Sequence, residues 1–295
     1  MGGVRQTMRR AVICAAALVA ILCSGPWPAD GQTGSYKAPR AAGGSGAPDL
    51  NGFWQALNTA NWDLEEHGTQ ASPFPELLGA YLAQPAGLSV VDGGTIPYRP
   101  EALVKRARFR ENRLKTDPLL VDGISEDLAD PEAKCFQGGV PRTTYLPLPF
   151  QIVQTKNKVL IAYEYAGAPR VVHLDKTREQ LLNIDSWMGQ SVGRWEGDAL
   201  VVDARWFHGP TVWLDRVGNF YSKDAYIVER YTPMSPDHLS YEATITDPTV
   251  FTRPWTIKMP LYRRMDADMV LLEFQCIPLA EPFMYGTLYK KQTTK

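Results

Sequence analysis

Apolar and polar residues alternate along most of the second half of this chain. Residues 191–207 contain two such runs, which meet at Glu196-Gly197. A glycine at a turn position adopts the positive φ that a tight hairpin requires. The pattern therefore predicts a strand, a two-residue turn at Glu196-Gly197 and a second strand, with Trp195 paired to Asp198.

Comparable runs continue almost to the C-terminus. Polar turn residues separate several of them, and no helical period lies between them. Short strands at this spacing favour an antiparallel barrel or sandwich. The runs are residues 150–154, 159–165, 171–174, 192–195, 200–207, 225–231, 239–246, 251–261 and 269–276.

The alternation also predicts which side chains face the interior. The inward face of the hairpin is expected to hold Trp195, Leu200, Val202, Ala204, Trp206 and His208. In the last run, the same argument turns Cys276 inward. The run 159–165 is apolar on both faces, so we expect a central strand in which Glu164 is the single ionisable group.

The N-terminal half is organised differently. Residues 1–31 combine three arginines, an apolar run and small residues near Ala29, which is typical of a secretory signal peptide and predicts a periplasmic or secreted protein. The apolar run is shorter than the roughly 20 residues that span a bilayer, so no membrane span is expected after cleavage. Residues 32–48 are rich in Gly, Ala, Ser and Pro and predict a flexible linker.

The remaining residues, 49–295, predict a single β-barrel domain. Within it, residues 49–134 are expected to form an irregular, partly helical decoration, and residues 135–295 the main antiparallel sheet. One surface helix is predicted from Glu101 to Leu114, with Leu103, Ala107 and Leu114 on one side.

Charge and cysteine content narrow the function classes. Removing residues 1–31 takes three arginines and Asp30 from 31 basic and 32 acidic side chains, which leaves a net charge of −3. Nucleic-acid binding needs a dense basic face, and we expect no such partner. The signal also contains two of the four cysteines, so the mature chain keeps Cys135 and Cys276. In an oxidising compartment we expect these two to form a disulfide, the alternative being two small buried side chains.

Two resemblances follow from short motifs. Gly52-Phe53-Trp54, ahead of the predicted strands, resembles the opening of the lipocalin superfamily, whose members bind small hydrophobic molecules inside a β-barrel. The motifs DLNGFW, DPEAKC, GVPR, GRWEGD, WLD and ERY, spread over residues 48–276, resemble a widespread family of uncharacterised exported bacterial proteins. The resemblances imply an exported, lipocalin-like β-barrel and bring no catalytic residues with them.

The sequence contains none of the common hydrolase, redox or nucleotide motifs. The four histidines of the mature chain are widely spaced, so we expect no metal site and no cofactor. Among them His208 is the best candidate for chemistry, because the alternation places it at the rim of the interior. The alternative is a hydrogen-bonded histidine that ends a strand.

Two carboxyl groups and one arginine complete the candidates. Glu164 and Glu229 lie in apolar runs, where desolvation would raise a carboxyl pKa toward the range of a general acid. The alternative for either is an ion pair with Arg142, Arg170 or Arg230. Arg142 ends a glycine-rich loop and is predicted to clamp an anionic group or, alternatively, to cap a turn.

Aromatic side chains offer flat surfaces for a ligand, although inward aromatic residues are commonly ordinary core. The candidates are Trp54, Tyr163, Trp195, Trp206 and Trp213. We therefore predict a small apolar or aromatic ligand and cofactor-free acid–base chemistry, such as isomerisation or elimination, by His208 with Glu164 or Glu229. The alternatives are a lipocalin-like carrier without turnover and an envelope scaffold without a cavity.

Overall fold

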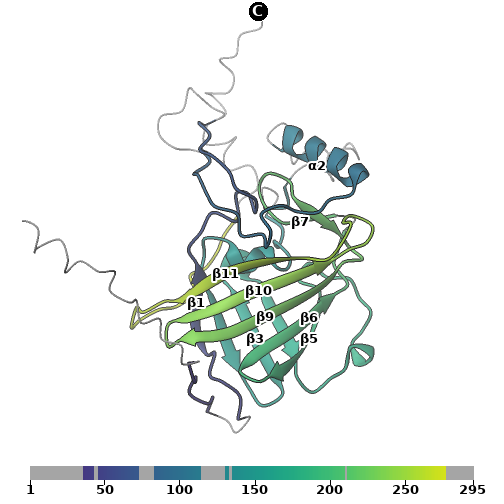
Figure 1. Ribbon diagram of the computed structural model, residues 1–295. Helices are drawn as coiled ribbons and strands as arrows, with labels where there is room; N and C mark the ends of the chain where they lie inside the picture. The colour runs from purple at the N-terminus through teal and green to yellow at the C-terminus, as the bar shows by residue number, and fades with distance from the viewer. Residues whose placement is uncertain are drawn as a thin grey trace, which may run out of the picture. The chain divides into compact units, whose positions relative to one another are not determined.

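The computed structural model describes residues 36–42, 46–72, 83–113, 130–132, 135–209 and 211–276. The predicted signal peptide lies outside these residues. The described part of the chain is mainly β, with a closed nine-stranded barrel and one α-helix, which confirms the predicted fold class (Figure 1). The architecture is consistent with a lipocalin-like barrel.

The barrel strands follow one another around the wall in the order β1-β11-β10-β9-β6-β5-β4-β3-β2. Their bounds are β1 Gly52–Ala56, β2 Phe150–Gln154, β3 Lys158–Tyr163, β4 Pro169–His173, β5 Gln190–Glu196, β6 Ala199–Arg205, β9 Tyr226–Ser235, β10 His238–Thr246 and β11 Trp255–Arg263. β1 lies in the stretch that we expected to decorate the barrel, but it pairs with β11 and β2 and closes the wall.

All neighbouring barrel strands are antiparallel except β4 and β5. These two pair in parallel through Val172 with Ser191 and His173 with Val192. The connection between them, residues 174–189, contains the short 3-10 helix η3 (Arg178–Gln180) and carries the chain back along the barrel. The expectation of an entirely antiparallel sheet is therefore wrong at this pair.

The hairpin of β5 and β6 has its turn one residue later than predicted. Trp195 pairs with Leu200 and Glu196 with Ala199, so the two turn residues are Gly197 and Asp198. Gly197 has the expected positive φ of 61°. The partner of Trp195 is thus Leu200 and not Asp198. Because this shift is two residues, each side chain stays on its predicted face of the sheet.

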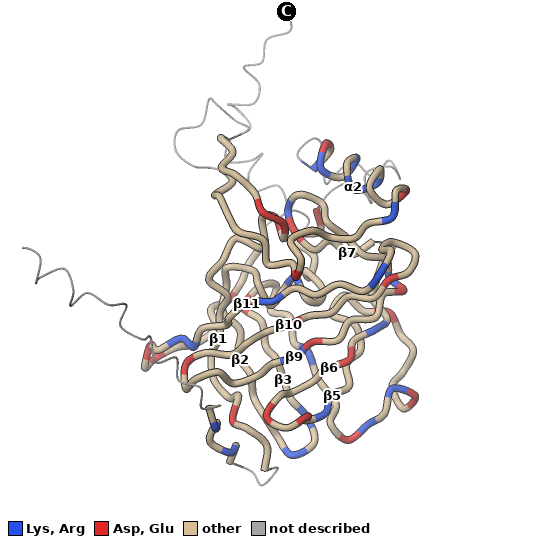
Figure 2. The backbone as a smooth tube through the Cα atoms, in the orientation of Figure 1, with Lys and Arg blue, Asp and Glu red and all other residues tan. Residues whose placement is uncertain are grey.

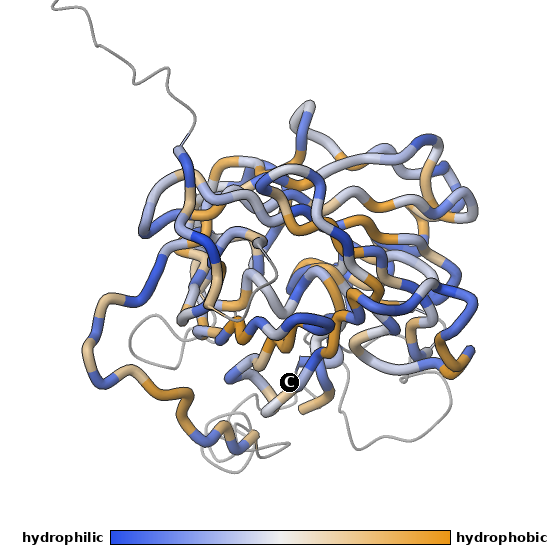
Figure 3. The backbone as a smooth tube through the Cα atoms, turned by 90° about the horizontal axis from the view of Figure 1, so that it is seen from below, coloured by the Kyte–Doolittle hydropathy of each residue, from blue (hydrophilic) through white to orange (hydrophobic). Residues whose placement is uncertain are grey.

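Inward positions of the strands form the main hydrophobic core, and the alternation of apolar and polar residues can be followed along the strands in Figure 3. β10 and β11 show it most regularly, because every second residue from Leu239 to Ile245 and from Trp255 to Leu261 is buried. Strand alternation thus fills the barrel with side chains from all sides.

One end of the barrel is covered by what we call the cap: the described residues between β1 and β2 and those between β6 and β9 (Figure 1). The cap contains the helix α2 (Pro100–Asn112), the 3-10 helix η1 (Arg142–Tyr145) and the two-stranded sheet of β7 (Thr211–Trp213) and β8 (Phe220–Ser222).

α2 packs on this small sheet through Phe109, whose ring lies 5.0 Å from that of Trp213 and 5.2 Å from that of Phe220. The helix prediction is confirmed, but its expected apolar side is wrong: Ala102 and Phe109 are buried, while Leu103 and Ala107 are exposed.

The predicted linker is ordered where it is described. Residues 39–41 and 47–49 lie antiparallel, with hydrogen bonds from Ala41 N to Ala47 O and from Asp49 N to Pro39 O. Gln154 at the end of β2 accepts from Leu50 N at 2.6 Å and donates to Pro48 O at 3.0 Å. Composition alone missed this, because the segment is ordered by contacts with the barrel and not by a core of its own.

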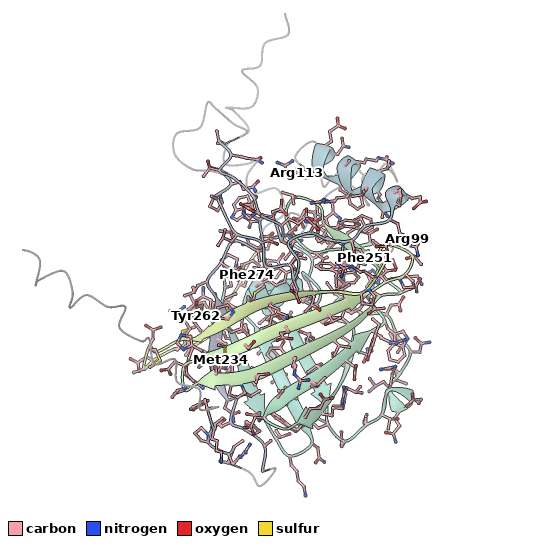
Figure 4. All side chains as sticks on the ribbon, viewed as in Figure 1. Arg99, Arg113, Met234, Phe251, Tyr262 and Phe274 are labelled. Atoms are coloured by element: carbon pink, nitrogen blue, oxygen red, sulfur yellow. A yellow bond between two sulfur atoms is a disulfide. The ribbon has the colours of Figure 1, made fainter. Side chains whose placement is uncertain are left out.

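The segment after β11, residues 264–276, crosses the outside of the protein without forming the predicted strand. The alternation in this segment was misleading. Val270, Leu272 and Cys276 are exposed, so the expectation that Cys276 points inward is wrong. A disulfide joins Cys276 to Cys135, as predicted. Phe274, labelled in Figure 4, packs on the ring of Tyr165. The disulfide therefore ties the end of the described chain to the cap.

Candidate functional site

The barrel interior holds an ion pair that is completely buried. Glu229 points inward from β9, and its Oε2 accepts from Arg170 Nη2 of β4 at 2.5 Å. The other oxygen, Oε1, accepts from the hydroxyls of Tyr231 at 2.9 Å and Tyr241 at 2.8 Å. Arg170 Nε also donates to Ser191 Oγ at 2.9 Å. The alternative of an ion pair with Arg170 is therefore confirmed for Glu229.

Burial and charge fix the protonation of these groups. Burial lowers the pKa of Arg170, but the charge of Glu229, the nearby tyrosines and the hydrogen bond to Glu229 together outweigh burial and leave the pKa well above its ordinary value. The pKa values of Tyr231 and Tyr241 are raised well above the ordinary value by burial and by the Glu229 charge. The arginine thus stays charged and both tyrosines stay protonated, which suits fixed hydrogen bonds to Glu229.

The space around this pair is filled. Glu229, Tyr231 and Tyr241 are each 0% exposed, so water reaches none of them. Tyr163, a predicted ligand-binding residue, is buried beside them, with its hydroxyl 3.1 Å from Thr144 Oγ1. A substrate could reach Glu229 only if the interior repacked, and we read the pair as part of the core.

A pocket lies at the barrel end opposite the cap. Its volume is about 210 Å³, and it lies between the barrel mouth and the N-terminal segment. Met234 and Tyr262, labelled in Figure 4, mark this end of the barrel. The lining residues are Trp54, Pro233, Ser235, Leu239 and Arg263 from the strands, Pro236 and Asp237 from the turn between β9 and β10, and Tyr36, Ala38, Pro39 and Asp49 from the N-terminal segment.

Trp54 and Arg263 form the floor of this pocket. The guanidinium carbon of Arg263 lies 4.2 Å from the centre of the Trp54 ring, and the indole Nε1 donates to Leu50 O at 2.9 Å. Arg263 Nη1 also donates to Asn51 O at 2.8 Å. Gly52 has a φ of 133°, and a Cβ at this position would collide with Arg263 Nη1. The glycine of the Gly52-Phe53-Trp54 motif therefore makes room for the arginine that covers the tryptophan.

His208 lies outside the barrel interior, contrary to the alternation argument. β6 ends at Arg205, and Trp206 adopts a positive φ of 61°. The residues after Trp206 therefore no longer follow the alternation of inward and outward side chains in β6. As a result Phe207 is fully buried, Trp206 is half-buried and His208 is exposed. The His208 ring packs on Trp187 at 4.8 Å. The expectation that His208 and Glu229 share one cavity is therefore wrong.

Glu164 is not part of a central strand. β3 ends at Tyr163, and Glu164 precedes the short 3-10 helix η2 (Tyr165–Gly167). Its Oε2 accepts from the backbone N–H of Leu272 at 2.9 Å. This carboxylate thus fastens the C-terminal segment to the barrel, and the structure does not bring it to the pocket.

Arg142 is occupied by carboxylates of the chain itself. Its two terminal nitrogens bind Asp130 at 2.6 and 2.8 Å, and Nη2 also lies 2.8 Å from Glu132. Arg216 holds Glu132 from the other side at 2.5 and 2.9 Å. An external anion would have to displace these partners, so the expectation of an anion clamp is wrong and Arg142 holds the cap together.

The remaining predicted tryptophans are divided between barrel and cap. Trp195 faces the core from β5 and is half-buried, whereas Trp213 is buried under α2 in the cap. Of the predicted ligand-binding residues, Trp54 alone is among the residues that line the described pocket. Arg263 and the N-terminal segment were missed, because the predicted run ended at residue 261, whereas β11 extends to Arg263.

The cap contains a pair of acidic residues that sequence reasoning also missed. Asp215 is completely buried and accepts from Leu64 N, Asn219 N and Asn219 Nδ2, the last at 2.6 Å. The same Asn219 amide donates to Asp63 at 3.2 Å. Burial and the nearby Asp63 raise the pKa of Asp215 to about 7, and burial also raises the pKa of Asp63. One proton can therefore be kept between two carboxyl groups that are remote in sequence.

Within the described ranges, no three His, Cys, Asp or Glu side chains are grouped so as to hold a metal ion. None of the helices described is both long and apolar enough to cross a bilayer. No protein-family model, curated protein or solved structure matches this chain.

Proposed function

We propose that this protein binds a small aromatic molecule in the pocket beside Trp54 and does not transform it. The observation that carries the proposal is the contrast between an open pocket, whose floor is Arg263 stacked on the Trp54 indole, and a filled interior around Glu229. A carrier needs only an apolar cavity with a few polar groups. An acid–base enzyme needs a histidine and a carboxyl group at one shared pocket, and His208, Glu164 and Glu229 do not meet at one.

The size of the pocket limits the ligand. Binding pockets for drug-sized molecules measure roughly 300–1,000 Å³, whereas a cavity of about 150 Å³ holds benzene. At about 210 Å³ the pocket suits one aromatic ring with a small substituent. Asp49 lines the same pocket. Its Oδ1 accepts from Asn51, so its other oxygen, Oδ2, is the acceptor offered to a hydroxyl or amino group on the ring.

The cellular location is part of the proposal. The signal-like residues 1–31, the resemblance to exported bacterial proteins and the disulfide between Cys135 and Cys276 all support a periplasmic or secreted protein. Disulfides persist mainly in such oxidising compartments.

Titration calorimetry with phenol, indole and benzoate as probes tests the proposal. Ala38 is nearly buried and lines the pocket, so Ala38→Trp fills it without changing a barrel strand. Lys37→Trp is the matched control, because Lys37 is exposed and does not line the pocket. We expect at least one probe to bind saturably to the wild type and Lys37→Trp, with an affinity at least about tenfold lower in Ala38→Trp.

Equal binding to both variants would show that the ligand occupies another place. Failure of all three probes to bind the wild type would contradict the proposed ligand class. The bound probe should also be recovered unchanged after prolonged incubation, and the appearance of a product would contradict a carrier.

A further inference from the structure

The pocket beside Trp54 is lined by three charged side chains that differ in their partners. Asp49 comes from the N-terminal segment, Asp237 from the turn between β9 and β10, and Arg263 from the end of β11. Figure 2 shows acidic and basic positions close together at this end of β10 and β11. Two carboxylates and one guanidinium leave the pocket with a formal charge of about −1.

Arg263 is largely occupied by the chain itself. Its Nε lies 3.7 Å from Asp237 Oδ1 and donates to Pro236 O at 2.9 Å, and Nη1 donates to Asn51 O at 2.8 Å. One face of the guanidinium lies on the indole below it. The remaining nitrogen, Nη2, is the donor left for an anionic group of a ligand, which would share the pocket with the carboxylates of Asp49 and Asp237. The pocket is therefore unfavourable for an anion.

Asp49, by contrast, is paired with no basic side chain in the part of the chain that is described. Its Oδ1 accepts from Asn51 N at 2.9 Å and from Asn51 Nδ2 at 2.7 Å, which are neutral donors. Asn51 is itself fixed, because its Oδ1 accepts from Gln154 N at 2.7 Å. Arg40, from the same N-terminal segment, pairs instead with Asp198 at 2.7 Å. The Asp49 carboxylate is thus held in a fixed orientation, with Oδ2 left to a ligand.

We propose that the ligand of this pocket is an aromatic amine in its protonated form, with the ammonium group on Asp49 Oδ2. The inference rests on the proposed binding function and adds the charge of the ligand to it. The ammonium group neutralises the carboxylate that the chain leaves without a cation, and charge-assisted hydrogen bonds of this kind are stronger than neutral ones. The ring then lies against the apolar and aromatic wall, which includes Tyr36, Pro39, Pro233 and Leu239.

Titration calorimetry with benzylamine, benzyl alcohol and benzoate tests the inference. The three probes share one ring and differ in the charge of its substituent. We expect the wild type to bind benzylamine at least about tenfold more tightly than benzyl alcohol, and benzoate most weakly. The affinity for benzylamine should also fall as salt is added, whereas that for benzyl alcohol should hardly change. These measurements need the wild type alone and do not depend on the folding of a variant.

Asp49→Asn tests whether this one side chain sets the preference. The amide keeps an oxygen for Asn51 and removes the charge, so the affinity for benzylamine should fall at least about tenfold and that for benzyl alcohol less than about twofold. Asp175→Asn is the matched control. It removes the same charge from an exposed acid that follows β4 at the same end of the barrel and does not line the pocket. The control should bind benzylamine like the wild type.

The outcomes separate the charge of the ligand from the binding function. Equal affinities of the wild type for benzylamine and benzyl alcohol would overturn the inference and leave the aromatic binding site in place. Failure of all three probes to bind would contradict the proposed function as well. Unchanged benzylamine binding by Asp49→Asn, or an equal loss of benzylamine and benzyl alcohol, would overturn the assignment to Asp49.

Discussion

Glu229 in the barrel and Asp215 in the cap are both completely buried carboxyl groups, yet their surroundings have opposite charge. Glu229 faces the guanidinium of Arg170 and two tyrosine hydroxyls. Asp215 faces another acid, Asp63, across the Asn219 amide that both contact. The barrel therefore contains a neutralised pair, whereas the cap contains two like charges that favour a shared proton.

This difference teaches that burial alone does not mark a site of chemistry. Glu229 lies deep in a strongly apolar strand, but its hydrogen bonds to Arg170, Tyr231 and Tyr241 occupy it. Asp215 lies in a loop, and the pKa of its carboxyl is raised to about 7 by burial and by Asp63. We therefore expect the stability to change with pH near 7 because of Asp215 in the cap, and not because of Glu229 in the barrel.

The largest effect is expected from breaking the barrel pair. Arg170→Met keeps most of the side-chain volume but leaves Glu229 as a buried charge without its partner. Loss of one member of such a pair costs about 3–5 kcal/mol of unfolding free energy. Urea unfolding followed by tryptophan fluorescence measures it, and adding Glu229→Gln to Arg170→Met should recover part of the loss.

Arg230→Met is the matched control. Arg230 is the neighbour of Glu229 in β9, but it points outward and pairs with Glu196, whose side chain is 41% exposed. An exposed pair contributes at most about 1 kcal/mol. Equal losses in Arg170→Met and Arg230→Met would mean that the interior pair has no special role.

A smaller, pH-dependent effect is expected from Asp215→Asn. The pKa of Asp215 lies near 7 in the folded protein, above its ordinary value of 3.8, so the protonated carboxyl stabilises the fold at low pH. This contribution is lost as the pH rises above the ordinary value and through 7, and by linkage the wild type should lose roughly 2–3 kcal/mol between pH 5 and 8 from this group. The asparagine has no proton to lose, so its stability should fall less over the same range.

Urea unfolding at pH 5 and pH 8 measures the difference. Asp224→Asn is the control, because Asp224 is an exposed acid in the loop that follows β8. The control should retain the pH dependence of the wild type. Parallel pH profiles for the wild type and Asp215→Asn would show that the cap pair does not hold a proton.

Local patterns were sufficient to predict most of the barrel. The alternation at 150–154 matches β2, and the faces of the β5–β6 hairpin are correct although its turn is one residue later. The same argument failed where the backbone departs from regular strand geometry, as at Trp206 with its positive φ. It also failed for residues 269–276, because alternation does not reveal whether a neighbouring strand is present to pair with.

The pocket was only partly predictable. Trp54 was a candidate because of its motif and its aromatic ring, but its covering arginine, Arg263, lies more than two hundred residues away in the sequence. Composition also described the segment of Ala38 and Ala41 as a linker, although both are buried. Sites formed by such distant segments depend on tertiary contacts, which no local pattern encodes.

The central claim is that the ligand site lies at the barrel mouth and that the interior is closed. A crystal structure of the protein soaked with 4-bromophenol tests it most directly, because the anomalous signal of bromine locates the ring. We predict a single strong peak in the pocket between Trp54 and Ala38. A peak inside the barrel against Glu229 and Tyr241 would contradict the account.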